Sequence, residues 1–180
     1  SDEVDESVDE TAEEDESDAP PKSIGSDGIE DIVSPVGEFE TYAKYDEIDF
    51  SVPKSVKNEL EKGLKWHEEG HSGDGLKSET VSWARRMANG SDISPDKAKK
   101  MNAWLARHES DKSGKGFKPG EDGFPSPGRV AWALWGGDPA VGWSAKLVRQ
   151  MEREDQQRKL SDLSQKVQKA LKKKAEDFNQ

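Results

Sequence analysis

Apolar residues recur every three to four positions in several short stretches in the middle of the chain, the spacing that gives a helix one apolar face. The first predicted helix begins near Ser55, a candidate N-cap, and ends at Gly70. The second begins at Ser78, another candidate cap, and ends at Asn89-Gly90. These stretches therefore predict two short amphipathic helices.

Three further helices are predicted from proline at the helix start. Proline suits the first turn because its fixed φ is helical and its missing N–H would have no partner there. The start signals are Ser94-Pro95, Ser126-Pro127 and Asp138-Pro139. Residues 110–126, which are rich in Gly, Lys, Asp and Pro, predict a long loop pinned by Phe117 and Phe124.

Beyond residue 153 the chain is mostly polar and carries only a thin apolar seam. Such a sequence predicts an amphipathic helix that needs a partner, because a lone helix with so little apolar surface is marginal in water. The candidate partner-binding residues are Leu160, Leu163, Val167 and Leu171.

Together these elements predict an all-α fold, a small bundle of four to five short helices with a long ordered loop. A disordered acidic arm precedes the bundle and a projecting C-terminal helix follows it. The predicted boundaries are 1–51 for the arm, 52–153 for the helical domain and 154–180 for the C-terminal amphipathic helix. The candidate core residues are Trp83, Met101, Leu105, Trp132, Leu134, Trp135 and Trp143.

Charge is distributed unevenly along the chain. Residues 1–50 hold 19 acidic side chains against Lys22 and Lys44, a net charge of −17; because the whole chain carries −11, residues 51–180 carry +6. The first 35 residues have too few apolar positions to offset the entropy of ordering, so we expect a solvated arm. The polarity then falls and aromatic residues appear among acids, which predicts a segment that docks on a partner or on the domain itself; its members are Phe39, Tyr42, Tyr45, Ile48 and Phe50.

The absence of cysteine excludes disulfides, thiolate metal sites and cysteine nucleophiles. No apolar run approaches the roughly 18 residues that cross a bilayer, and the N-terminus lacks the basic and apolar regions of a signal peptide. We therefore expect a soluble protein that is neither secreted nor bound to a membrane.

One short motif suggests metal chemistry. His67-Glu68-Glu69-Gly70-His71 matches H-E-x-x-H, in which two histidines one helical turn apart hold zinc and the glutamate acts as general base. The geometry needs a continuous helix, whereas Gly70 predicts a helix end. His67, Glu68 and His71 are thus weak metal candidates, and we expect no metal, no cofactor and no catalytic residue.

His108 is open to two interpretations. With Glu109 and Asp111 it could form a metal or proton-transfer site, but a histidine that closes an amphipathic helix face is more often packed. The glycines of residues 114–123 match neither a P-loop nor a dinucleotide-binding motif, so nucleotide binding is not supported.

Two neighbouring predicted helices, 78–88 and 95–108, resemble a helix-turn-helix in outline. The second would present a basic surface, with Lys97, Lys99, Lys100 and Arg107 as candidate nucleic-acid-binding residues. The alternative is an ordinary helical hairpin with a solvated lysine face, and a surplus of +6 is small for a nucleic-acid binder.

A longer pattern covers roughly Val52 to Arg149. Its most specific segments are Met87 to Gly90 (MANG), Ile93-Ser94, Arg107 to Lys112 (RHESDK), Gly120 to Gly123 (GEDG) and Pro125 to Asp138 (PSPGRVAWALWGGD). With these segments the chain resembles a small tryptophan-rich helical domain that recurs in tailed-bacteriophage proteins, within or beside head-maturation proteases and other head-morphogenesis polypeptides. No protease residues carry over, because the chain has no G-x-S-x-G motif.

The resemblance implies a non-enzymatic virion or head-assembly protein, scaffold-like or capsid-associated, that acts by protein–protein interaction. Its expected partners are capsid or other head proteins, and its expected location is the virion or the host cytoplasm. An acidic arm and a thin terminal helix fit this function, since both become ordered or neutralised against a partner. The alternative function is helix-turn-helix-like binding of nucleic acid, with DNA as partner.

Overall fold

The computed structural model describes residues 43–180, in which every regular element is helical and no β-strand occurs. The predicted all-α class is therefore confirmed, while the predicted arm up to residue 42 lies outside the described residues. The elements are α2 (Lys54–Glu68), α3 (Ser78–Ala88), α4 (Pro95–His108), the 3-10 helix η2 (Glu109–Ser113), α5 (Pro127–Leu134) and α6 (Gly137–Phe178).

Two of the predicted helix starts form as the local sequence requires. The Ser94 hydroxyl accepts a hydrogen bond from the Lys97 backbone N–H at 3.1 Å, and proline follows it at the start of α4. Ser126 accepts from the Arg129 N–H at the same distance and begins α5 in the same way. In both, the serine satisfies an N–H that the helix leaves without an internal partner.

The predicted caps at Ser55 and Ser78 are wrong by one or two residues. Helix α2 already begins at Lys54, and the Pro53 carbonyl accepts from the Lys57 N–H at 3.0 Å, so Ser55 lies inside the first turn. Ser78 is itself the first residue of α3, and Lys77 occupies the N-cap position without a capping hydrogen bond from its side chain. The earlier start leaves both hydroxyls too far along the helix to cap it.

Glycine ends α2 and α3 where the sequence predicts. Gly70 and Gly90 have φ of +87° and +104°, a left-handed conformation that side chains disfavour. The following N–H groups of His71 and Ser91 return to the carbonyls of Trp66 and Arg86, both at 3.0 Å. These are Schellman turns, which satisfy the last carbonyls of each helix.

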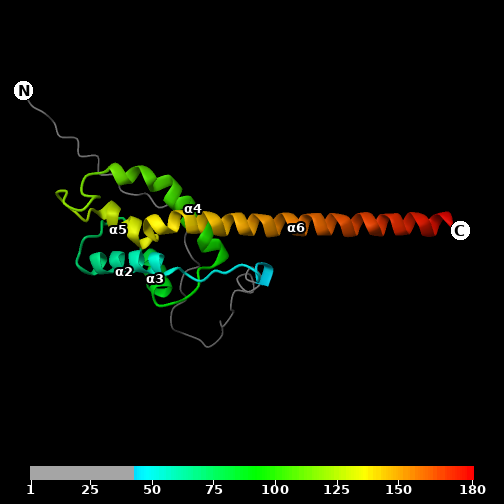
Figure 1. Ribbon diagram of the computed structural model, residues 1–180, viewed down its shortest axis with the longest axis horizontal. Helices are drawn as coiled ribbons and strands as arrows, with labels where there is room; N and C mark the ends of the chain where they lie inside the picture. Colours follow the sequence, from blue (N-terminus) through cyan, green and yellow to red (C-terminus); the bar gives the residue numbers. More distant parts are fainter. Residues whose placement is uncertain (1–42) are drawn as a thin grey trace, which may run out of the picture.

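The helices pack in two groups that share one core (Figure 1). Helix α2 packs against α3 and α5, and α4 packs along the first part of α6. Five predicted core residues are fully enclosed: Met101, Leu105, Trp132, Leu134 and Trp135. Trp83 and Trp143 differ from the prediction, because they are only partly buried and pack against the edge of the core.

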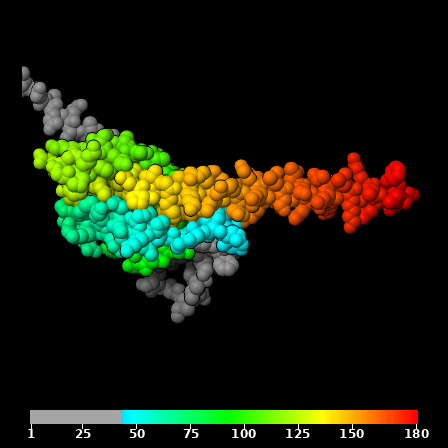
Figure 2. Space-filling view, in the orientation of Figure 1, coloured from blue at the N-terminus to red at the C-terminus, as the bar shows by residue number. Residues whose placement is uncertain are grey.

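Helix α6 is one continuous helix of 42 residues, so no break in secondary structure accompanies the predicted boundary between residues 153 and 154. Only the first part of α6, up to Met151, faces the core, and we call this part its root. Its buried residues include Ala140, Ser144, Leu147 and Met151. The remainder projects far beyond the other helices (Figure 2). Despite its length it is polar, and within residues 43–180 no helix is long and apolar enough to cross a membrane.

Residues 43–52 belong to the helical domain, whereas the sequence assigned most of them to the arm. Tyr45, Phe50 and Val52 are buried in the core, and the Phe50 carbonyl accepts from the Ile93 N–H at 3.1 Å. The described part of the aromatic segment thus docks on the domain itself, one of the two predicted outcomes. The contact depends on residues far along the chain, which local patterning does not reveal.

Helices α2 and α5 approach closely at Gly63. A Cβ added there would lie 2.9 Å from the Ala133 Cβ and 2.9 Å from the Leu134 backbone nitrogen. Neither neighbour is the end of a flexible side chain that could move aside. Gly63 therefore sets the distance between the two helices.

Gly63→Ala should destabilise the protein by about 1–3 kcal/mol, because the clash outweighs the roughly 1 kcal/mol that alanine gains in a helix. Gly142→Ala is the matched control: Gly142 is also inside a helix, but an added Cβ there meets nothing within 4 Å. That control should be neutral or stabilising by up to about 1 kcal/mol. Urea unfolding followed by circular dichroism measures both, and equal effects of the two substitutions would contradict the close approach.

Candidate functional site

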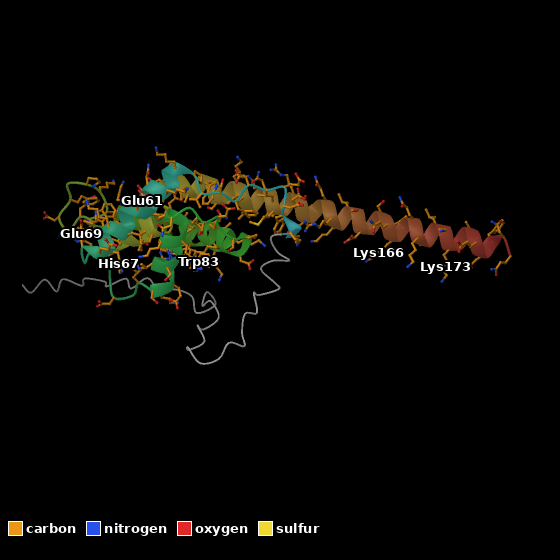
Figure 3. The ribbon with its side chains drawn as sticks, turned by 90° about the horizontal axis from the view of Figure 1, so that it is seen from below. Glu61, His67, Glu69, Trp83, Lys166 and Lys173 are labelled. Carbon is orange, nitrogen blue, oxygen red and sulfur yellow. The ribbon has the colours of Figure 1, made fainter. Side chains whose placement is uncertain are left out.

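The H-E-x-x-H residues do not form a metal site. Helix α2 ends at Glu68, so His67 lies in its last turn (Figure 3), and His71 lies beyond the left-handed Gly70. The two histidines have different partners: His67 Nδ1 lies 2.6 Å from the Ser72 hydroxyl, and His71 Nε2 lies 3.7 Å from the Glu69 carboxylate. Among the described residues no group of three His, Asp or Glu side chains is placed to hold a metal ion.

His108 is engaged in packing. Its ring stacks on Trp104 with 4.2 Å between ring centroids, and its Nδ1 lies 2.8 Å from the Asp111 carboxylate. The histidine therefore joins the end of α4 to η2. Within residues 43–180 His108 belongs to no group of three potential metal ligands, and its contacts are those of a packed side chain.

A column of aromatic and cationic side chains runs through the core beside α4. The Lys97 ammonium lies 3.7 Å from the centroid of the Trp135 ring, and Trp135 stacks on Trp104 at 5.1 Å with nearly parallel planes. Trp83 extends the column, with Lys97 at 5.3 Å and the Arg86 guanidinium at 4.3 Å. Cations are drawn to indole faces by the negative potential above the ring. We call these residues the tryptophan column.

The position of Lys97 in the tryptophan column contradicts part of the predicted nucleic-acid-binding surface. Lys97 is only 6% exposed, so it cannot contact a phosphate backbone from its position between indoles. Lys99 and Arg107 are exposed, and Lys100 is half-buried. Helix α3 also packs chiefly on α2, whereas α4 packs chiefly on α6. The two helices of a helix-turn-helix pack on each other, so the predicted outline is wrong in its packing.

The described residues present their largest exposed apolar side chains on the projecting part of α6. Leu160, Leu163, Val167 and Leu171 are all more than half exposed, and Phe178 is 90% exposed. We call the first four the α6 seam. Leu160 follows the buried Met151 by nine residues, which at 3.6 residues per turn places it about half a turn from the face that packs on the domain. The α6 seam thus faces away from the core.

Just before the seam, α6 contacts Lys44 and Tyr45, at the beginning of the described chain. The Tyr45 hydroxyl donates to the Asp155 carboxylate at 2.9 and 3.1 Å, and the Lys44 ammonium lies 2.9 Å from the same carboxylate. The Arg158 guanidinium lies over the Tyr45 ring at 5.5 Å. We call this group the α6 anchor. Asp155 and Arg158 were not singled out from the sequence, where only the aromatic residues of the docking segment gave a signal.

The contacts of the α6 anchor lower the pKa of Asp155. Burial acts to raise the pKa of Asp155, but the hydrogen bonds from Lys44 and Tyr45 and the charges of Lys44 and Lys99 together hold it below its ordinary value of 3.8. Burial and the neighbouring carboxylate raise the pKa of Tyr45. The phenol therefore stays neutral and donates its proton to an ionised aspartate.

Comparison of the chain with protein-family models, with curated proteins and with solved structures gave no match.

Tyr45→Phe should lower the free energy of unfolding at neutral pH by about 0.5–1.5 kcal/mol, the usual value of one hydrogen bond. Because the folded-state pKa of Asp155 is depressed, its carboxylate stabilises the fold above the unfolded pKa and loses that contribution as pH falls through the folded pKa. Without the phenol, stability should fall less steeply below about pH 4.

Urea unfolding at a series of pH values tests this, with Asp155→Asn as the matched background. In that background Tyr45→Phe should no longer alter the pH dependence, since the titrating group is gone. If the free energy of unfolding falls equally steeply with decreasing pH in wild type and in Tyr45→Phe, the phenol does not stabilise the carboxylate.

Proposed function

We propose that the protein is a non-enzymatic assembly component that binds another protein through the α6 seam, as part of a bacteriophage head or its assembly pathway. The observation that carries the proposal is the exposure of Leu160, Leu163, Val167 and Leu171 along one side of a helix that projects from a fixed root. An apolar row at helical spacing is the feature by which an amphipathic helix enters a groove or pairs with another helix.

The energetics favour a bound state for this part of α6. Residues 159–178 are exposed throughout, so no tertiary packing within the described chain stabilises them. Helices gain most of their stability from such packing. Binding to a partner supplies such packing, because it buries four branched aliphatic side chains, each worth about 1.5–3 kcal/mol when fully enclosed.

The phage setting is supported by the resemblance of residues 52–149 to the domain found in head-morphogenesis proteins. In that setting the partners are capsid or other head proteins, and the protein resides in the virion or in the host cytoplasm. Catalysis is not part of the proposal, because a helix end separates His71 from His67 and Glu68, and His108 is stacked on Trp104.

Nucleic-acid binding is the competing function. Burial of Lys97 removes one of its four predicted contacts and leaves Lys99, Lys100 and Arg107. Size-exclusion chromatography with light scattering separates the two functions when the protein is run alone, with the major capsid protein and with duplex DNA, at low and physiological salt. The proposal predicts co-elution with capsid protein at both salts. Co-elution with DNA alone, weakening steeply with salt, would replace it with the competing function.

A seam variant gives the sharper test. Leu163→Glu with Val167→Glu should abolish co-elution with the capsid protein and leave the melting temperature within about 2 °C, because substitutions at exposed positions change stability little. Gln165→Glu with Gln168→Glu is the matched control, since it adds the same charge to neighbouring positions off the seam. Equal loss of binding in both variants would show that charge, and not the α6 seam, governs the interaction.

A further inference from the structure

The described chain starts beside the point where α6 leaves the domain. Lys44 and Tyr45 are held on Asp155 by contacts of 2.9 Å, so the first described residues lie next to α6. Figures 1 and 2 show this start, in cyan, alongside the beginning of the projecting helix. The arm is therefore tethered at one end of the α6 seam.

A row of lysines continues from the α6 anchor along the helix. Lys159, Lys166 and Lys173 follow Asp155 by 4, 11 and 18 residues, spacings that return to the same side of an α-helix. All three are exposed, and Lys166 and Lys173 can be followed along the projecting helix in Figure 3. We call them the lysine row.

The lysine row and the α6 seam lie side by side. Leu163 is four residues after Lys159 and three before Lys166, the spacings at which side chains are neighbours on a helix surface. Residues 156–180 hold seven Lys or Arg against three Asp or Glu, a net charge of +4. This part of α6 thus combines an apolar stripe with a basic edge.

The chain contains a segment of complementary chemistry. Residues 24–42 carry five acidic side chains and no basic one, a net charge of −5. Apolar residues recur among those acids every few positions: Ile29, Ile32, Val33, Val36 and Phe39. The distance to be covered, 18 residues of α6 from Asp155 to Lys173, is about 27 Å at 1.5 Å per residue. Nineteen extended residues span about 60 Å, so the segment reaches the whole seam.

We infer that residues 24–42 of the same chain dock along α6, with their apolar side chains on the α6 seam and their acids against the lysine row. Tethering at the α6 anchor gives this segment a millimolar effective concentration, which a free acidic peptide lacks. A second α6 is a poorer occupant, because two such helices side by side bring their lysines together. The inference concerns the surface used in the proposed function, and it implies that a partner must displace the arm.

Hydrogen exchange of the full-length protein, followed by mass spectrometry, tests the docking. Amides of residues 160–175 should exchange about tenfold more slowly in wild type than in Ile32→Asn with Val36→Asn, which removes two apolar side chains from the arm and leaves its charge unchanged. The triple variant Lys159→Glu, Lys166→Glu and Lys173→Glu should lose the same protection. A control triple, Lys54→Glu, Lys115→Glu and Lys118→Glu, makes the same change of charge at exposed positions outside α6 and should behave as wild type.

Equal exchange of residues 160–175 in wild type and the arm variant would overturn the inference. Protection that rises with protein concentration would also overturn it, because it would identify a second copy as the occupant. These outcomes are separable from failure of the proposed function, since they need no partner. Loss of docking with retained capsid binding removes only this inference, and docking without capsid binding removes only the proposed function.

Discussion

The rest of the fold depends on the stacking of Trp135 on Trp104, with the Lys97 ammonium over the Trp135 ring. Trp104 belongs to α4, and Trp135 ends α5 immediately before the two glycines that lead into α6. One stack thus joins three helices. Among the described residues neither indole N–H has an acceptor, at a cost of about 1–3 kcal/mol for a buried donor. The ring faces must therefore supply the net stabilisation, through stacking and the cation above Trp135.

The start of α6 is fixed by this stack and by polar contacts around it. Asp138, in the first turn, accepts a hydrogen bond from the Trp132 indole at 3.0 Å and pairs with Lys112 at 2.8 Å. Burial acts to raise the pKa of Asp138, but these partners and the charge of Arg129 lower it below its ordinary value. Its negative charge also suits the helix N-terminus. Because the start of α6 is fixed in this way, the continuous helix presents the α6 seam in a defined direction relative to the domain.

Local features of the fold were predictable because they depend on a few adjacent residues. The caps at Ser94 and Ser126 and the helix ends at Gly70 and Gly90 are of this kind. The burial of Lys97 was not predictable, because it depends on indoles that α3 and α5 supply. Likewise, Tyr45 and Asp155 are 110 residues apart, and nothing in either neighbourhood marks the pair. The predicted boundary after residue 153 reflects a change of composition, which marks where the core ends and not where a helix ends.

The α6 seam was predictable for a different reason. An apolar residue in a polar helix needs a partner wherever the chain folds, so Leu160, Leu163, Val167 and Leu171 stood out without knowledge of the core. Their orientation relative to the domain was not accessible, since it depends on the continuity of α6 from its buried root. Sequence thus identified the candidate surface, and the structure adds its direction and the α6 anchor beside it.

The most direct measurement for this account is the unfolding free energy of Trp135→Ala, followed by circular dichroism in urea. If the tryptophan column holds α4, α5 and the root of α6 together, the substitution should cost about 3–5 kcal/mol, the value for a buried aromatic side chain. Trp143→Ala, at the partly buried edge of the core, should cost clearly less. A Trp135→Ala protein as stable as wild type would contradict the account.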